Sequence, residues 1–273
     1  MTPQISIVIP SYNEELYLPL LLEDLADQTE HDFEVIIADG ASTDKTKMKS
    51  IVFKKRLPLR FLTSPKQQVA AQRNYGALHA KGKYVIFLDA DMRVKKDFVA
   101  QLLEAVKEHR RLLFIPSHKP DSDYPHDELL YNIQSFFIEL SHHTKKPFTY
   151  GPAVLFLKWF YDHLGGYDES VAFAEDQEII QRARDNGVIA QLLPDIEVYF
   201  STRRYENEGR LNVMRKYLQA SVILLTEGKI DKEIFEYEMG GSADYLIEKK
   251  KKEGFPEVLK SNLEKLKLFF DEK

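Results

Sequence analysis

The chain has 273 residues, of which 44% are hydrophobic and 30% are charged, and its formal net charge is −5. This is the composition of an ordinary globular protein, and the lack of a basic excess argues against a nucleic-acid partner. The sequence contains no cysteine, which excludes disulfides, thiolate zinc sites and cysteine nucleophiles. No apolar run approaches the roughly 20 residues of a membrane span, and the start lacks a signal-peptide pattern, so we expect a cytoplasmic protein.

Strand and helix patterns alternate through the first 116 residues. Short apolar runs rich in β-branched residues predict strands over residues 5–9, 33–38, 59–62, 84–88 and 112–115. Helical spacing of apolar residues predicts helices over 18–25, 69–80 and 96–109, with Ser42 or Thr43 as the N-cap of a further helix. This alternation is typical of βαβ units, so we predict an α/β fold with a mostly parallel central sheet flanked by helices.

After Pro116 the alternation breaks. The sequence predicts a loop over 117–125, an amphipathic helix over 129–140, a strand over 153–157, a helix over 175–186, strands over 189–193 and 198–200, and a second amphipathic helix over 211–225. From residue 231 the chain is rich in Lys and Glu and helical in character. We therefore divide it into a nucleotide-binding half (1–116), a half that completes the site (117–228) and a helical C-terminal extension (229–273).

An acidic pair follows the most apolar of these strands. Asp89 and Asp91 come directly after the run that begins at Tyr84. In an open α/β sheet, ligands bind outside the carboxyl ends of the strands, and Mg²⁺ typically uses one or two carboxylates together with substrate phosphates. For an isolated Asp-x-Asp, the simpler explanation is that two polar residues close a strand. The metal-site interpretation therefore depends on the other motifs in the sequence.

Polar residues also follow the first two strands. Tyr12, Asn13 and Glu14 come after the first strand, and Asp39 closes the second. In a parallel sheet these loops share an edge with Asp89 and Asp91, where Asp39 could accept an N–H from a nucleobase and Tyr12 could stack on it. Ordinary turn chemistry explains each of these residues equally well when it is taken alone.

Glu175 and Asp176 open a predicted helix. Acidic residues there stabilise the helix dipole by about 0.3–1 kcal/mol each. The alternative is a general base, since a helix start fixes the direction of a carboxylate and apolar neighbours raise its pKa. Spacing alone does not separate the two explanations.

Other phosphate and hydrolase motifs are absent from the sequence. There is no Gly-x-Gly-x-x-Gly after the first strand, and the segment from Gly40 to Thr46 lacks the glycine before lysine that a P-loop requires. No Gly-x-Ser-x-Gly nucleophile elbow is present. Dinucleotide oxidoreductases and serine hydrolases of these types are therefore disfavoured.

Together, five segments resemble the family 2 glycosyltransferases, inverting enzymes with the GT-A fold. In chain order they are Ile7 to Glu14, Val35 to Asp44, Ala71 to Ala77, Ala80 to Asp91, and Gly165 to Glu169 followed by Ala174 to Asp176. Their order and spacing match over about residues 4 to 190. The resemblance implies a nucleotide-sugar donor, a Mg²⁺ or Mn²⁺ ion, and a single displacement at the sugar.

The resemblance also implies roles for individual residues. Pro10, Tyr12, Glu14 and Asp39 would form the nucleoside pocket, Arg73 would lie against the base or diphosphate, and Asp89 would contact ribose or donor sugar. Asp91, with Asp89, would hold the metal. Asp176 would be the catalytic base, Glu175 and Gly151 would face the acceptor, and Arg203 or Arg204 would hold the leaving diphosphate unless they only form surface salt bridges.

Two departures from related sequences matter. Some relatives supply a late histidine to the metal, but here the last histidine is His163, before Glu175. The Gln-x-x-Arg-Trp motif of processive synthases is missing, and the only tryptophan is Trp159. Processive synthesis is therefore disfavoured.

Several alternatives stay open at this point. The rival functions are a sugar-nucleotide-forming nucleotidyltransferase and a nucleotide-sugar-binding module without catalysis. The donor would be UDP- or GDP-linked, and the acceptor would be a glycan hydroxyl or a lipid phosphate. The amphipathic helices would rest on a membrane surface or, as we favour, pack onto the sheet, since the first has no basic face. The sequence does not indicate the oligomeric state.

Overall fold

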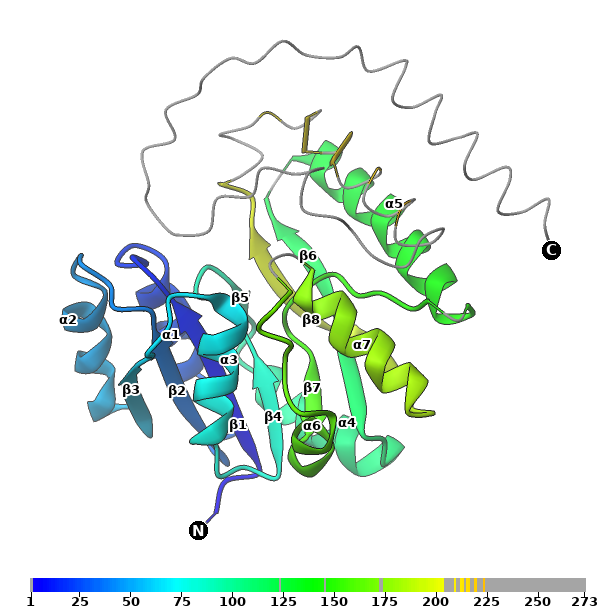
Figure 1. The fold of residues 1–273 in the computed structure, drawn as a ribbon. Coiled ribbons are helices and arrows are strands. Elements are labelled where there is room, and N and C mark those ends of the chain that lie inside the picture. Colours follow the sequence, from blue (N-terminus) through cyan, green and yellow to red (C-terminus); the bar gives the residue numbers. More distant parts are fainter. Residues whose placement is uncertain are drawn as a thin grey trace.

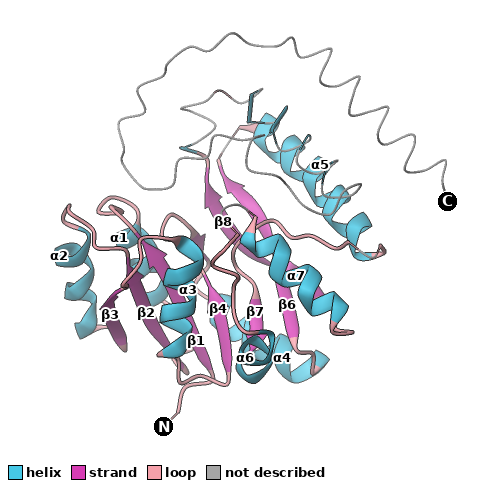
Figure 2. Ribbon diagram, in the orientation of Figure 1, coloured by secondary structure: helices cyan, strands magenta, loops and turns pink. Residues whose placement is uncertain are grey.

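The computed structural model describes residues 2–122, 124–144, 146–171 and 174–203, and further along the chain residues 209, 212–213, 215–216, 219 and 223. Its centre is a sheet with strand order β3-β2-β1-β4-β7-β6-β8-β5. Figure 1 shows this twisted sheet with helices on both faces, and Figure 2 shows the alternation of strands and helices along it. The predicted α/β class is confirmed.

The first half of the chain builds one side of the sheet from parallel strands. β1 (Ile5–Ser11) pairs with β2 (Phe33–Asp39) and β4 (Tyr84–Phe87), and β2 pairs with β3 (Leu59–Thr63). The intervening helices are α1 (Leu18–Ala26), α2 (Thr46–Ile51), the 3₁₀ turn η1 (Val52–Lys55), α3 (Val69–Leu78) and α4 (Phe98–His109). All four strands run in the same direction, so the residues after β1, β2 and β4 meet at one edge.

The rest of the sheet lies beyond β4 and contains strands of both directions. β7 (Leu155–Leu157) runs antiparallel to β4 and to β6 (Leu113–Asp121), whereas β8 (Gln191–Ser201) runs parallel to β6. The short strand β5 (Arg93–Val94) closes the far edge against β8. The helices of this half are α5 (Pro125–His142), α6 (Lys158–Leu164) and α7 (Glu175–Asp185).

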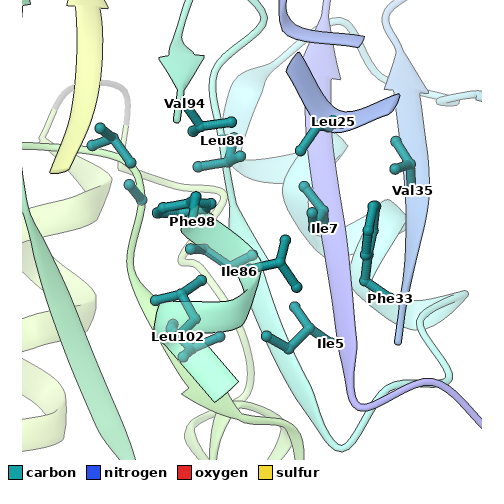
Figure 3. Close-up of a cluster of buried hydrophobic side chains, with 14 of the residues drawn as sticks. Ile5, Ile7, Leu25, Phe33, Val35, Ile86, Leu88, Val94, Phe98 and Leu102 are labelled. Carbon is teal, nitrogen blue, oxygen red and sulfur yellow. The ribbon is translucent and has the colours of Figure 1, made fainter. Parts of the chain in front are cut away.

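Two hydrophobic cores lie on opposite faces of the sheet because strand side chains alternate. Ile5, Ile7 and Ile9 of β1 belong to a cluster that includes residues of α1 and α4. Figure 3 shows part of it, with Leu25 of α1 and Phe98 of α4 beside the strand side chains. Val8 belongs to the other cluster, with residues of α3, α6 and α7. Both faces are therefore covered, which fixes the strand ends that carry the polar residues.

The second half differs from the prediction in three places. The segment predicted as a loop is strand up to Asp121, because β6 continues along β8 as far as Ser201. β8 is one strand where two were predicted. Its register with β6 shifts between Pro116 and Ser117, which pair with Leu193 and Glu197, so residues 194–196 are accommodated in a bulge. The helix α6 was not predicted, and neither was β5 in the first half of the chain.

The remaining predictions concern helices and the C-terminus. The predicted helix over 129–140 is present and longer, as α5. Of the predicted helix over 211–225, only scattered residues are described, and the C-terminal extension and Arg204 lie outside the described residues. Within the described part of the chain, no helix is both long and apolar enough to cross a bilayer.

Candidate active site

The loops after β1 and β2 are joined by hydrogen bonds at the edge of the sheet. Asn13 donates its backbone N–H to Ser42 Oγ at 2.8 Å and accepts the Thr43 N–H on Oδ1 at 2.9 Å. The Glu14 N–H donates to Thr46 Oγ1 at 2.8 Å. Ser42 and Thr43 are therefore not the helix caps that the sequence suggested: α2 begins at Thr46, and the two residues connect the loops instead.

Asp39 lies between these loops and is 3% exposed. Its carboxylate accepts hydrogen bonds from Ser11 Oγ at 3.0 Å, from the Ser42 N–H at 2.8 Å and from Ser42 Oγ at 2.5 Å. A carboxylate offers about four acceptor positions, so one remains for a ligand N–H. Pro10 is buried and Tyr12 is partly exposed beside it, which gives this pocket both an apolar wall and an aromatic side chain.

Arg73 of α3 joins the two halves of the chain. Its guanidinium donates to Asp89 Oδ1 at 2.9 Å, to Glu175 Oε1 at 2.9 Å and to Asp176 Oδ1 at 2.7 Å. It also lies 5.1 Å from the centre of the Tyr167 ring. Because Arg73 is 1% exposed, these contacts hold it in place, and the acidic end of β4 and the start of α7 face each other across one cation.

The turn before α7 is attached to α3 by Asn74. Asn74 Oδ1 accepts from Tyr161 Oη at 2.7 Å and from the Tyr167 N–H at 2.8 Å, while Nδ2 donates to the Tyr167 carbonyl at 2.9 Å. Gly166 has φ +75°, and an added Cβ would lie 2.6 Å from Asn74 Oδ1. The Gly-Gly-Tyr segment is therefore shaped by this contact, and Asn74 and Tyr167 are site residues to which the sequence analysis assigned no role.

Asp176 sits at the start of α7, where the backbone is constrained. The preceding Ala174 has φ 62°, a left-handed conformation that is costly for a residue with a side chain. Across from it, Gly151 has φ +125°, and a Cβ built there would lie 3.8 Å from Asp176 Oδ2. Gln177 holds the two segments together by exchanging two hydrogen bonds with the Thr149 backbone, at 2.7 and 2.9 Å. Gly151 thus lies beside the Asp176 carboxylate.

Burial raises the pKa of Asp176 to about 8, although Arg73 opposes that shift. The negative charges of Glu175 and Asp89 add to the increase in pKa. Burial, like charges and a specific cation around one carboxylate are the surroundings that functional sites use to tune a proton acceptor.

A second cation lies at the end of β8. Arg203 donates to Glu14 Oε2 at 3.2 Å and Oε1 at 3.0 Å, and its Nη2 lies 3.0 Å from Asp91 Oδ2. Burial raises the pKa of Glu14 to about 7, and Arg203 opposes the shift. Residues from β1, β4 and β8 therefore meet at this point, as expected for the edge predicted to bind a ligand.

The profile of the family described as Glycosyl transferase family 2 matches residues 6–165. The chain belongs to this family. The matched range includes the two loops predicted to bind the nucleoside, Arg73 and the acidic end of β4, and the resemblance noted in the sequence is confirmed.

Curated family members resemble parts of this chain. A Haemophilus influenzae protein described as an uncharacterized glycosyltransferase is 33% identical over 112 residues, which are 41% of this chain and 37% of that protein. The poly(ribitol-phosphate) β-N-acetylglucosaminyltransferase TarS of Staphylococcus aureus is 24% identical over 204 residues, 73% of this chain and 35% of TarS. The chain thus matches less than half the length of these two relatives.

Solved structures of glycosyltransferases share the fold. S. aureus TarS in complex with UDP-GlcNAc superposes with a TM-score of 0.60 at 19% identity, covering 81% of this chain and 66% of that one. A Pyrobaculum calidifontis mannosyltransferase in complex with GDP-Man and Mn²⁺ gives 0.63 at 20% identity, covering 86% and 67%. The predicted GT-A-like fold of this family 2 member is confirmed.

The acidic end of β4 fits a divalent ion that takes its other ligands from a substrate. The side chains of Asp89 and Asp91 are 35% and 22% exposed, and each has one oxygen paired with an arginine. Within the described part of the chain, no group of three or more His, Asp or Glu side chains is arranged to hold a metal. Two carboxylates without further protein ligands suit Mg²⁺ or Mn²⁺ bound together with phosphate oxygens.

A buried histidine lies under the same site. The imidazole of His118 stacks on Tyr150 with ring centres 4.9 Å apart, and burial lowers its pKa to about 4. His118 falls in the segment predicted as a loop but lies in β6, and no local pattern indicated this position. A neutral, fixed imidazole supports the Tyr150–Gly151 segment from below.

Most of the predicted site residues come together. Asp89, Arg73, Glu175, Asp176 and Gly151 form one group, and Glu14, Asp91 and Arg203 form the adjoining one; Pro10, Tyr12 and Asp39 line the neighbouring loops. Contact of Arg73 with a base or diphosphate stays a prediction, since its bonds in the structure go to carboxylates. The predicted roles of the other residues toward ligands also stay predictions.

Proposed function

We propose that this protein transfers a sugar from a UDP- or GDP-linked donor to an acceptor hydroxyl or lipid phosphate, with inversion at the sugar carbon and with help from Mg²⁺ or Mn²⁺. The observation that carries the proposal is the Arg73 group. One buried guanidinium bonds Asp89, at the strand end expected to bind the donor, and Asp176, at the helix start expected to bind the acceptor. An inverting transfer needs these two functions on opposite sides of one sugar.

Asp176 is the proposed base. Its second oxygen, Oδ2, lies 3.8 Å from the position that a Cβ on Gly151 would take, so any side chain there would lie against the oxygen that we expect to receive the acceptor hydroxyl. The carboxylate would take the proton of that hydroxyl as its oxygen bonds to the sugar carbon and the bond to the nucleoside diphosphate breaks. The raised pKa of Asp176 suits a base that works near neutral pH.

Asp91 and Asp89 are the proposed metal ligands. When bound, a divalent cation would offset the charge that develops on the departing nucleoside diphosphate. Pro10, Tyr12 and Asp39 would hold the nucleoside; Asp39 would accept N3–H of uracil or N1–H of guanine. Support for such donors comes from the solved neighbours, which bind UDP-GlcNAc, and GDP-Man with Mn²⁺.

A panel of UDP- and GDP-sugars with Mn²⁺ or Mg²⁺ tests the proposal. Melting temperature reports binding, release of UDP or GDP reports turnover, and the anomeric configuration of the product, read by NMR, reports the stereochemistry. We expect one donor to raise the melting temperature only when metal is present and to give an inverted product. A melting shift without nucleotide release would instead identify a binding module, and a retained configuration would overturn the role of Asp176.

A further inference from the structure

Arg203 is paired with Asp91, the residue that we propose as a metal ligand. Its Nη2 lies 3.0 Å from Oδ2 of Asp91 and 3.0 Å from Oε1 of Glu14, and its Nη1 lies 3.2 Å from Oε2 of Glu14. The guanidinium also stacks 4.8 Å from the centre of the Tyr17 ring. Arg203 thus makes two hydrogen bonds to Glu14 and is also ion-paired with Asp91.

The pairing creates a conflict for a metal that arrives alone. A divalent ion at Asp91 would come next to a guanidinium that already neutralises this carboxylate, and two cations beside one anion repel each other. A metal that arrives with a nucleoside diphosphate brings its own negative charge. The diphosphate also offers Arg203 new acceptors, and guanidinium groups bind phosphate oxygens well.

We propose that Arg203 acts as an internal cation that competes with the divalent metal for Asp91, and that the nucleoside diphosphate ends this competition by pairing with the guanidinium in place of Asp91. This inference rests on the proposed metal site at Asp91. Glu14 can keep its hydrogen bonds to Arg203 during the exchange, so the guanidinium stays attached to the loop after β1. The Arg203 side chain is 27% exposed, so the guanidinium can reorient at a solvent-accessible edge.

The test measures Mn²⁺ binding to the whole protein without nucleotide. Binding is monitored as a decrease in the EPR signal of free Mn²⁺. Arg203→Gln removes the competing cation and should bind Mn²⁺ about tenfold more tightly, equivalent to about 1.4 kcal/mol. Arg56→Gln is the matched control, because Arg56 also bonds two carboxylates, Glu23 and Asp27, neither of which is a predicted site residue. It should leave Mn²⁺ affinity unchanged, which separates local competition from a change in net charge.

A second arm adds UDP or GDP at saturating Mn²⁺. Arg203→Gln should now bind the nucleotide about tenfold more weakly, because the diphosphate loses a charged donor. Opposite signs in the two arms are the signature of an exchange. Unchanged or weaker binding of Mn²⁺ alone by Arg203→Gln would overturn the competition, even if nucleotide binding fell.

Asp91→Asn distinguishes failure of this inference from failure of the proposed function. If Asp91→Asn loses Mn²⁺ binding and Arg203→Gln tightens it, the proposed metal site and the competition both stand. If Asp91→Asn loses Mn²⁺ binding and Arg203→Gln changes nothing, the metal site stands and the competition is wrong. If Asp91→Asn binds Mn²⁺ like the wild type, the metal site is wrong and the competition falls with it. Melting curves of each variant establish that it is folded.

Discussion

Two arginines pair with carboxylates at the edge of the sheet, and they differ in burial and in the number of their bonds. The Arg73 side chain is 2% exposed and is bonded to Asp89, Glu175 and Asp176, whereas the Arg203 side chain is 27% exposed and is bonded to Glu14 and Asp91. A buried cation cannot leave its carboxylates without leaving them unpaired, which is costly. A partly exposed cation such as Arg203 can exchange partners because water and ligands reach it.

The difference separates two tasks within one site. The Arg73 group fixes the position of the proposed base relative to the strand end that carries Asp89. The Arg203 group surrounds the proposed metal ligand and can change with the ligands present. In the proposed transfer, rigid geometry at the reacting centre and adaptable charge at the leaving group would belong to different arginines.

The largest expected effect comes from Arg73. Arg73→Met leaves three buried or partly buried carboxylates without their cation, so we expect a loss of about 3–5 kcal/mol in the free energy of unfolding and a loss of turnover. Urea denaturation and a turnover assay measure the two effects. Arg56→Met, whose partners Glu23 and Asp27 are exposed, should cost at most about 1 kcal/mol. Equal losses in the free energy of unfolding for the two variants would contradict the claim that burial makes the Arg73 contacts more stabilising than those of Arg56.

Asp39 extends the comparison to a carboxylate whose described partners are hydroxyls and an N–H rather than an arginine. A hydrogen bond to a charged group contributes about 1.5–3 kcal/mol, so Asp39→Ala should weaken UDP or GDP binding roughly 10- to 150-fold. Isothermal titration calorimetry measures the affinity. Ser11→Ala, which removes one support of Asp39 but keeps the acceptor, should bind nearly normally. Unchanged affinity of Asp39→Ala for both nucleotides would make Asp39 a residue that only joins the two loops.

A separate expected effect is a slope of stability with pH. Burial raises the folded-state pKa of Glu14 to about 7 and that of Asp176 to about 8, so between about pH 4 and pH 8 the native state binds more protons than the unfolded chain. The free energy of unfolding should therefore fall as pH rises, by up to about 1.4 kcal/mol per pH unit for each group.

Variants assign this slope to the two groups. Glu14→Gln should flatten the dependence up to about pH 7, and Asp176→Asn should flatten it up to about pH 8, as read from urea midpoints at a series of pH values. A wild-type stability that rises over this range would contradict the raised pKa values of both carboxylates.

Sequence reasoning located this site well where the chain is regular. The strands before Asp39 and Asp89 are buried on both faces, so their apolar runs and acidic ends are plain in the sequence, and the shared edge follows from parallel topology. It worked less well beyond Pro116. β6 continues to Asp121 only because β8 lies beside it, and a polar, proline-bearing segment carries no local sign of such a partner.

Side-chain partners were harder still to predict. Arg73 and Asp176 are 103 positions apart, and nothing local to either residue indicates that they bond. Asn74 and His118 were missed for the same reason, since their positions depend on segments distant in the sequence. The pairing of Arg203 with Asp91 could be found only when the end of β8 was placed beside the loops after β1 and β4.

The most direct test of the account is the turnover of Asp176→Asn, measured beside its donor affinity and melting temperature. The amide is nearly isosteric but cannot accept the proton, so we expect normal metal and nucleotide binding and a loss of roughly 10²–10⁴-fold in kcat. Asp185→Asn makes the same change at the exposed end of α7 and should leave kcat unchanged. A near-wild-type kcat for Asp176→Asn would contradict its role as the base and reduce it to a helix-start residue that stabilises the α7 dipole.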